Sequence, residues 1–163
     1  MQKKYTSLGL MSGTSGDGVD ASIIHSNGID HFEVIQDRYF EYDSNIYKNI
    51  HYLKEKIFNF SDLKKYSEEL KILEKKITIF HAKVIKELKF NNEDILVGFH
   101  GQTIYHNANE KVSVQLGDGR LLSQLTKRKV IFNFRQNDIL NGGEGTPLAP
   151  IFHQLIATQN KIS

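Results

Sequence analysis

Three strand-like runs open the chain, and the turns that join them are short. The runs are Tyr5–Met11, Val19–His25 and Phe32–Phe40, and the second alternates apolar and polar side chains as a half-buried strand does. A parallel crossover needs a dozen or more residues, so strands joined by such turns pair most simply as antiparallel neighbours. We therefore expect the chain to begin with a three-stranded antiparallel sheet.

A long helical pattern follows these runs. Apolar residues recur at alternating spacings of three and four from a candidate cap at Ser61 to Val84, which predicts one helix over 61–88. A shorter pattern over 44–58, with Ser44 as its expected cap, precedes it. The long pattern also fits a coiled-coil seam, but the strands on both sides of it favour a helix laid across a sheet.

The second half of the chain alternates strands, turns and short helices. It predicts a turn at Asn91-Asn92, strands at Ile95–Phe99, Val112–Leu116 and Lys129–Phe134, a polar loop over 100–111 and a helix near Leu121–Lys127. A glycine-rich loop then leads to Thr146 and Pro147, the expected cap and first residue of a last helix. The order predicts an α/β fold, with a mixed sheet that starts antiparallel and continues parallel between flanking helices. It is similar to the ribonuclease-H-like arrangement of actin-like ATPases and sugar kinases.

Composition limits the class of protein. With 163 residues, 39% of them hydrophobic and 25% charged, the chain matches one soluble globular domain. It has no cysteine, which excludes disulfides and thiolate metal sites, and its seven histidines lack a metal-ligand spacing. No apolar run approaches the roughly 18 residues of a membrane helix, and the N-terminus makes a poor signal peptide. We expect a cytoplasmic protein with no membrane partner.

Positive charge is concentrated in one stretch. Residues 48–90 carry 11 Lys or Arg against 6 Asp or Glu, whereas the rest of the chain carries 10 against 13. The lysines alternate with acids along a predicted helix, which is typical of a solvated face and not of a nucleic-acid surface. No nucleic-acid partner is expected.

The turn between the first two strands has the composition of a phosphate-binding loop. Its peptide N–H groups and hydroxyls can surround phosphate oxygens, and Asp17 offers a hard oxygen to Mg²⁺. An ordinary Gly/Ser hairpin turn is the alternative, and a Walker-type loop does not fit because no Lys-Ser/Thr pair follows the glycines. Within the loop, 9–20, the candidate nucleotide-binding residues are Gly13, Thr14, Ser15, Gly16, Asp17, Gly18, Val19 and Asp20.

Several separated motifs resemble those of the anhydro-N-acetylmuramic acid kinases. Residues 8–20 read LGLMSGTSGDGVD and are similar to the family's GLMSGTSLDGVD. Residues 98–106 are similar to its GxHGQTxxH, and 114–118 to its QIG(D/N). Residues 133–153 resemble its DFRxxD followed by GGQGAPLVPxFH. The resemblance covers nearly the whole chain and implies the ribonuclease-H-like fold.

The resemblance also implies a reaction. Family members use ATP and Mg²⁺ to hydrolyse the 1,6-anhydro ring of anhydro-N-acetylmuramic acid and phosphorylate O6, giving N-acetylmuramic acid 6-phosphate in cell-wall recycling. The first loop would bind the nucleotide phosphates, and segments 98–106 and 133–153 would line the sugar cleft. The candidate cleft residues are His100, Gln102, Arg135, Asp138, Gly142 and Gly143. Each also has a structural alternative, such as an Arg135–Asp138 pair, contacts to loop backbone, or a glycine needed only for a turn.

Four positions depart from the family pattern. They are Gly16 for Leu, Asn133 for Asp, Glu144 for Gln and Thr146 for Ala. The first makes the phosphate-binding loop more flexible, and the others change the charge and polarity of the expected sugar cleft.

The resemblance places part of the active site outside this chain. In the family, the general-base aspartate lies in a motif downstream of the position that matches Ser163, the last residue here. A second, C-terminal half that completes the nucleotide site also lies there, and we expect it as a partner. Residues 1–163 are therefore expected to form the N-terminal domain of a two-domain kinase, to hold no catalytic base and to be inactive alone.

Two other classes remain open. A non-catalytic actin-like nucleotide-binding or assembly module would bind ATP but no sugar and would associate through the helix over 61–88. A glycosidase would use paired carboxylates such as Asp138 and Glu144 and would need no ATP. Self-association into a homodimer is a further expectation.

Overall fold

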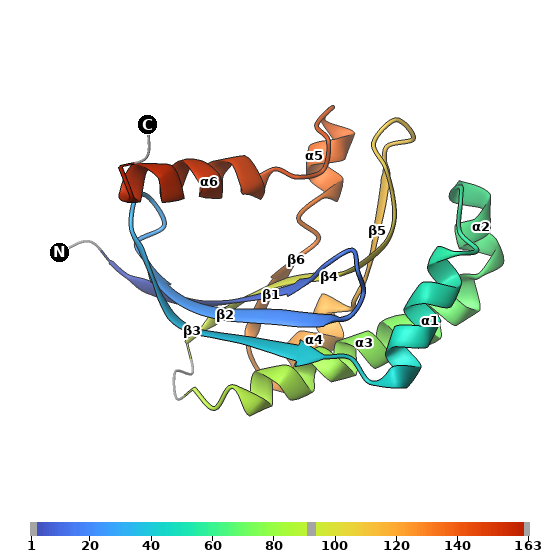
Figure 1. Cartoon of the computed structure of the whole chain (residues 1–163), viewed down its shortest axis with the longest axis horizontal. Coiled ribbons are helices and arrows are strands. Elements are labelled where there is room, and N and C mark those ends of the chain that lie inside the picture. The colour runs from blue at the N-terminus through green and yellow to red at the C-terminus, as the bar shows by residue number, and fades with distance from the viewer. Residues whose placement is uncertain (1–2, 91–93, 162–163) are drawn as a thin grey trace.

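A computed structural model describes residues 3–90 and 94–161, and a mixed sheet with helices on both faces forms its centre (Figure 1). The strands are β1 (Tyr5–Ser12), β2 (Gly18–Ser26), β3 (Phe32–Glu41), β4 (Leu96–Asn107), β5 (Val112–Leu116) and β6 (Lys129–Phe132). The helices are α1 (Ser44–Lys54), α2 (Phe60–Lys65), α3 (Ser67–Glu87), α4 (Gly119–Thr126), α5 (Gln136–Leu140) and α6 (Leu148–Gln159).

Two predictions fall on positions outside the described residues. One is the turn expected at Asn91-Asn92. The other concerns Ser163, beyond which the catalytic base is expected. The structure therefore tests neither the turn nor the position of the base, and both stay predictions.

The strand pairing confirms the predicted mixed sheet. β1 pairs with β2, and β2 with β3, both antiparallel. β4 joins β1 in parallel, and β6 joins β4 in parallel, while β5 returns antiparallel along the C-terminal half of β4. The connection from β3 to β4 runs through α1, α2 and α3, which gives the length that a parallel crossover needs.

One face of the sheet carries the hydrophobic core. Alternate side chains of β1, β2 and β4, such as Leu8, Val19 and Val97, are fully buried and lie in one cluster with the apolar seam of α3, including Leu73 and Ile77. α1, α3 and α4 cover this face, whereas α6 lies across the opposite face (Figure 1). The apolar seam of α3 is therefore buried against the sheet, as expected for a helix laid across a sheet and not for a coiled coil.

The predicted long helix is interrupted near its start. α2 ends at Lys65, its C-cap Tyr66 has ψ at 22°, and α3 begins at the next residue. Asn59 caps α2, with Asp62 completing a capping box. The expected single helix was wrong because the backbone leaves the helical conformation at Tyr66. Its expected cap at Ser61 was wrong because Asn59, two residues earlier, already accepts from the first-turn N–H groups.

Two other predicted caps were also wrong, although their helices are present. The Asp43 carboxylate, and not Ser44, accepts hydrogen bonds from the first-turn N–H groups of α1. Pro147, and not Thr146, is the N-cap of α6, which has no side-chain cap. In both cases the N-cap lies one residue away from the position that the sequence indicated.

The segment 100–111, expected as a polar loop, is mostly strand. β4 continues to Asn107 and pairs with β5, so that the turn is confined to 108–111. Ile104 and Tyr105 are buried on this extension. The strand was missed because a bulge at Gly101, with φ at 74°, breaks the alternation of the sequence pattern.

α6 is attached to the sheet at its far end. The Gln159 side chain donates from Nε2 to Phe32 O at 2.9 Å and accepts from Phe32 N at 3.2 Å. Leu148, Ile151 and Phe152 of this helix remain exposed. Neither α6 nor any other helix among the described residues is long and apolar enough to cross a membrane.

Candidate functional site

The loop between β1 and β2 has its carbonyl groups turned toward the body of the protein. Gly13 O accepts from Gln102 Nε2 at 2.9 Å and from Gly16 N at 3.1 Å. Thr14 O accepts from the Lys54 ammonium at the end of α1. Donors from β4 and α1 thus hold two successive carbonyl oxygens inward.

Apart from that of Gly16, several N–H groups of the same loop lack a partner in the described part of the chain. Those of Thr14, Ser15 and Asp17 have no acceptor among the residues that the structure describes, whereas Asp17 O accepts from Tyr42 N at 2.8 Å. Adjacent peptide units with inward oxygens and unpaired N–H groups make an electropositive concavity that suits an anion. The loop therefore has the polarity of a phosphate-binding site.

Two glycines let the loop lie close to its neighbours. Gly16 has φ at +76°, and an added Cβ there would lie 2.8 Å from Ile50 Cγ2 on α1. A Cβ on Gly18 would lie 2.4 Å from Phe40 O on β3. Substitution at either position would displace the loop from the helix or strand that supports it.

The predicted nucleotide-binding residues divide into three groups. Residues 13–18 form the loop, Val19 is fully buried in the core, and Asp20 faces the opposite side of the sheet. Asp17 is exposed, and no cluster of three or more His, Asp or Glu residues that could hold a metal occurs in the described part of the chain. Asp17 therefore fits Mg²⁺ only as a single protein ligand, with nucleotide and water oxygens completing the shell.

A buried polar chain supports the start of the loop. His81, fully buried, donates from Nδ1 to Ile77 O at 2.8 Å, which leaves Nε2 to accept from Ser12 Oγ at 3.3 Å. The Tyr42 hydroxyl then donates to Ser12 Oγ at 2.8 Å. Burial lowers the pKa of His81 to about 4, so the ring is neutral at pH 7. This series of hydrogen bonds fixes the end of β1 to α3.

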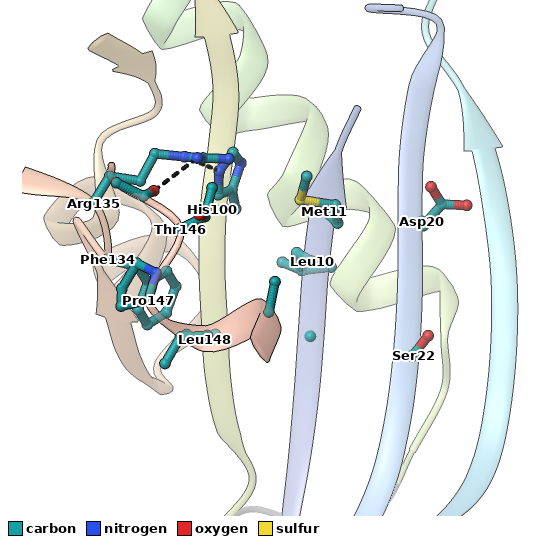
Figure 2. Close-up of a pocket in the computed structure, with 14 residues that line it drawn as sticks. Leu10, Met11, Asp20, Ser22, His100, Phe134, Arg135, Thr146, Pro147 and Leu148 are labelled. Atoms are coloured by element: carbon teal, nitrogen blue, oxygen red, sulfur yellow. Dashed lines mark hydrogen bonds between the residues drawn. The ribbon is translucent and has the colours of Figure 1, made fainter. Parts of the chain in front are cut away.

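A cavity of about 460 Å³ opens on the other face of the sheet, beneath segment 145–149 (Figure 2). Its floor includes Gly9 of β1 and Gly98 of β4, which are direct partners in the parallel ladder, and Ser22 of β2. Because glycine carries no side chain, the backbone of the sheet is open to a ligand here.

Arg135 and His100 form one polar side of this pocket (Figure 2). His100 Nδ1 donates to Gly101 O at 2.7 Å, and its Nε2 accepts from Arg135 Nε at 2.9 Å. Arg135 Nη1 donates to Gly145 O at 2.8 Å. Burial, together with the nearby guanidinium, lowers the pKa of His100, which keeps the imidazole neutral. Asp20 lies across the pocket from this pair (Figure 2).

Asp138 does not pair with Arg135, the structural alternative considered from the sequence. Its Oδ2 accepts from Gly145 N at 2.7 Å, so both side chains hold the backbone of Gly145. Gly143 lies so close that an added Cβ would be 2.3 Å from Asp138 Oδ2, whereas Gly142 has φ at +91° and open space around it. These three predicted cleft residues stand outside the pocket lining, and Asp138 contacts the lining only through Gly145.

Gln102 lies with the loop and not in the pocket. The bulge at Gly101 shifts the register between β1 and β4, so Gln102 turns to the core face while His100 stays on the open face. Gln102 is fully buried, and its Oε1 has no partner in the described part of the chain.

Several residues that support the loop carry no sequence signal. Lys54 is one of many lysines on solvated helices, and His81 lies within the apolar seam of α3. Tyr42 follows β3 without a motif of its own. Only the tertiary fold brings these residues to the end of β1, so a pattern along the chain could not reveal them.

The fold and its two adjoining sites define an α/β domain of the ribonuclease-H-like class, which actin-like ATPases and sugar kinases share. The family model described as "Anhydro-N-acetylmuramic acid kinase" matches residues 5–163. The chain therefore belongs to the anhydro-N-acetylmuramic acid kinase family.

Relatives of that name cover almost all of this chain. The protein from Pelagibacter ubique is 60% identical over 164 residues, which is 99% of this chain and 44% of the relative. The proteins from Rhizobium etli and Agrobacterium fabrum are 35% and 34% identical, over 93% and 96% of this chain and 42% and 43% of their own length. The chain thus spans less than half the length of the curated relatives it matches.

Proposed function

We propose that residues 1–163 form the N-terminal domain of an ATP-dependent kinase acting on anhydro-N-acetylmuramic acid in the cytoplasm. The observation that carries the proposal is the adjacency of two sites. Met11 and Asp20 are the last paired residues before the β1–β2 loop, and both line the pocket on the open face. A ligand in the pocket would therefore lie next to a polyphosphate on the loop, as phosphoryl transfer requires.

The proposed reaction divides its groups between the two sites. Water adds to C1 of the anhydro sugar, the C1–O6 bond breaks, and O6 forms a bond to the γ-phosphorus as the bond to the ADP oxygen breaks. The loop N–H groups would hold the phosphate oxygens, and Mg²⁺ beside Asp17 would neutralise their charge. The base that takes the proton of water is expected beyond Ser163, so residues 1–163 alone should give no turnover.

The polar side of the pocket suits an acidic amino sugar. The Arg135 guanidinium is a planar donor that fits a carboxylate or carbonyl oxygen, and the neutral His100 holds it in place. Asp20 can accept from a sugar hydroxyl on the opposite side. Asp138, in contrast, is occupied at Gly145, which weighs against a glycosidase pair of Asp138 and Glu144.

The test is a chimera in which residues 1–163 replace the matching part of the Pelagibacter ubique relative. We expect ATP-dependent conversion of the anhydro sugar to a 6-phosphate, detected by mass spectrometry. Turnover without ATP would indicate a glycosidase, and ATP binding without sugar binding would indicate an assembly module. Size-exclusion chromatography of the same protein tests the expected homodimer.

Arg135 gives a sharper test of the pocket. We expect Arg135→Lys to raise the KM for the sugar about tenfold, because lysine loses the planar fork that contacts both His100 and Gly145. The KM for ATP should change little. An unchanged sugar KM would remove Arg135 from the proposed binding site.

A further inference from the structure

Two side chains from outside the glycine-rich motif hold the carbonyl groups of the β1–β2 loop. Lys54, in the last turn of α1, donates to Thr14 O. Gln102, beyond the bulge in β4, donates from Nε2 to Gly13 O at 2.9 Å. Neither residue lies near the loop in sequence, and only the fold brings them to consecutive peptide units.

The orientation of these carbonyls determines which N–H groups are available. In a trans peptide unit the C=O of one residue and the N–H of the next point in opposite directions. With Gly13 O and Thr14 O held inward, the N–H groups of Thr14 and Ser15 point outward. These are the N–H groups found without an acceptor among the described residues. A reversed peptide unit would instead present an oxygen to the phosphates and repel them.

Lys54 also brings positive charge to the C-terminal end of α1, where the helix dipole disfavours a bound anion. Lys54 lies in the last turn of α1 beside the loop, and the carbonyl end of a helix carries partial negative charge. A lysine in this last turn offsets that charge. The motif contains no lysine of its own, so an ammonium group reaches the loop from α1 instead.

The contact with Gly13 O also determines which way the Gln102 amide is turned. Its Nε2 faces Gly13 O, and rotation of the amide would bring Oε1 against that oxygen. The carboxamide is thus fixed by the loop and is fully buried.

We propose that Lys54 and Gln102 are positioning residues that set the polarity of the loop for the polyphosphate of a nucleotide. This inference rests on the proposed function, because it assumes that phosphate binds the loop. It adds Lys54, which belongs to no recognised motif, and moves Gln102 from the sugar cleft to the nucleotide site.

The experiment compares Lys54→Met with Lys48→Met in the chimera described above. Lys48 is an exposed lysine on the same helix and serves as the matched control. We expect Lys54→Met to weaken ATP and ADP binding about tenfold, measured by calorimetry, and to raise the KM for ATP similarly. In Lys54→Met, the affinity for adenosine and the KM for the sugar should stay unchanged. The conservative variant Lys54→Arg should retain most of the ATP affinity of the wild type.

Gln102→Glu provides an independent second variant. It replaces the Nε2 donor with an acceptor at Gly13 O, so it should weaken ATP binding without weakening adenosine binding. Unfolding by urea reports whether either variant loses stability. Because adenosine lacks phosphates, a general loss of structure would weaken adenosine and ATP together.

The outcomes separate this inference from the proposed function. A wild-type chimera that binds no ATP would overturn both. ATP binding by the wild type that is unchanged in Lys54→Met and Gln102→Glu would overturn the positioning role alone. A parallel loss of adenosine and ATP affinity in both variants would also overturn it.

Discussion

At the scale of single residues, burial keeps the two supporting histidines neutral. His81 receives a hydrogen bond from Ser12, and His100 receives one from Arg135. Each uses its unprotonated Nε2 as an acceptor, and each has a lowered pKa because burial disfavours the charged ring. Protonation of either ring would therefore break a contact that supports the loop or the pocket.

Stability should consequently fall in acid. The pKa of His81 is about 4 in the fold, against 6.5 for an ordinary histidine, so its contribution is complete above pH 6.5 and is lost as the pH falls toward 4. The loss amounts to roughly 3 kcal/mol, at about 1.4 kcal/mol for each unit of pKa. Urea unfolding at pH 7 and pH 4.5 would measure it. His81→Gln should show a weaker pH dependence, and an unchanged dependence would contradict this explanation.

Gly18 should tolerate no side chain. A Cβ there would lie 2.4 Å from Phe40 O, a backbone atom that cannot move alone. We expect Gly18→Ala to lower the free energy of unfolding by about 1–3 kcal/mol. Gly9→Ala is the control, because the atom nearest to its Cβ is Ser22 O at 3.9 Å. Equal stability of the two variants in urea unfolding would show that the close contact is relieved.

At the scale of elements, the sequence pattern predicted the antiparallel start, the α3 seam and the parallel continuation. Periodicity reports burial on one face, and these elements each keep one face buried. The β4 extension was missed because the bulge at Gly101 interrupts that periodicity. The N-caps were misassigned because Asn59 and Asp43, and not the nearby serines, accept from the first-turn N–H groups.

The candidate site was predicted less completely than the fold. The composition of the loop and the family resemblance indicated the loop, and the resemblance also implied that segments 98–106 and 133–153 line one cleft. The sequence could not indicate that His100 and Gln102 face opposite sides of the sheet, which depends on one inserted residue in β4. Nor could it indicate Lys54, whose role depends on where α1 ends.

The bulge itself can be tested. Gly101 has φ at +74°, and an added Cβ would lie 2.6 Å from Leu116 O. We expect Gly101→Ala to lower the melting temperature and to weaken ATP binding about tenfold, because Gln102 would turn away from the loop. Gly98→Ala in the same strand is the control for stability, with its nearest neighbours at 3.8 Å. Unchanged ATP affinity in Gly101→Ala would show that the bulge does not determine how the loop binds ATP.

At the scale of the whole molecule, the loop and the pocket meet at the end of the β1–β2 hairpin. The core face supports the loop through α1 and α3, while the open face forms the pocket beneath segment 145–149. The loop and the pocket, supported from opposite faces of the sheet, thereby meet where β1 ends and β2 begins. Under the proposed function, this arrangement would place an acceptor sugar beside a phosphate donor.

The most direct test is a crystal structure of the chimera with Mg²⁺ and a non-hydrolysable ATP analogue. The proposed phosphate-binding role of the loop predicts phosphate oxygens about 2.9 Å from the N–H nitrogens of Thr14 and Ser15, with Asp17 facing the metal ion. A structure in which residues 13–18 touch no phosphate, and the triphosphate binds elsewhere, would contradict it.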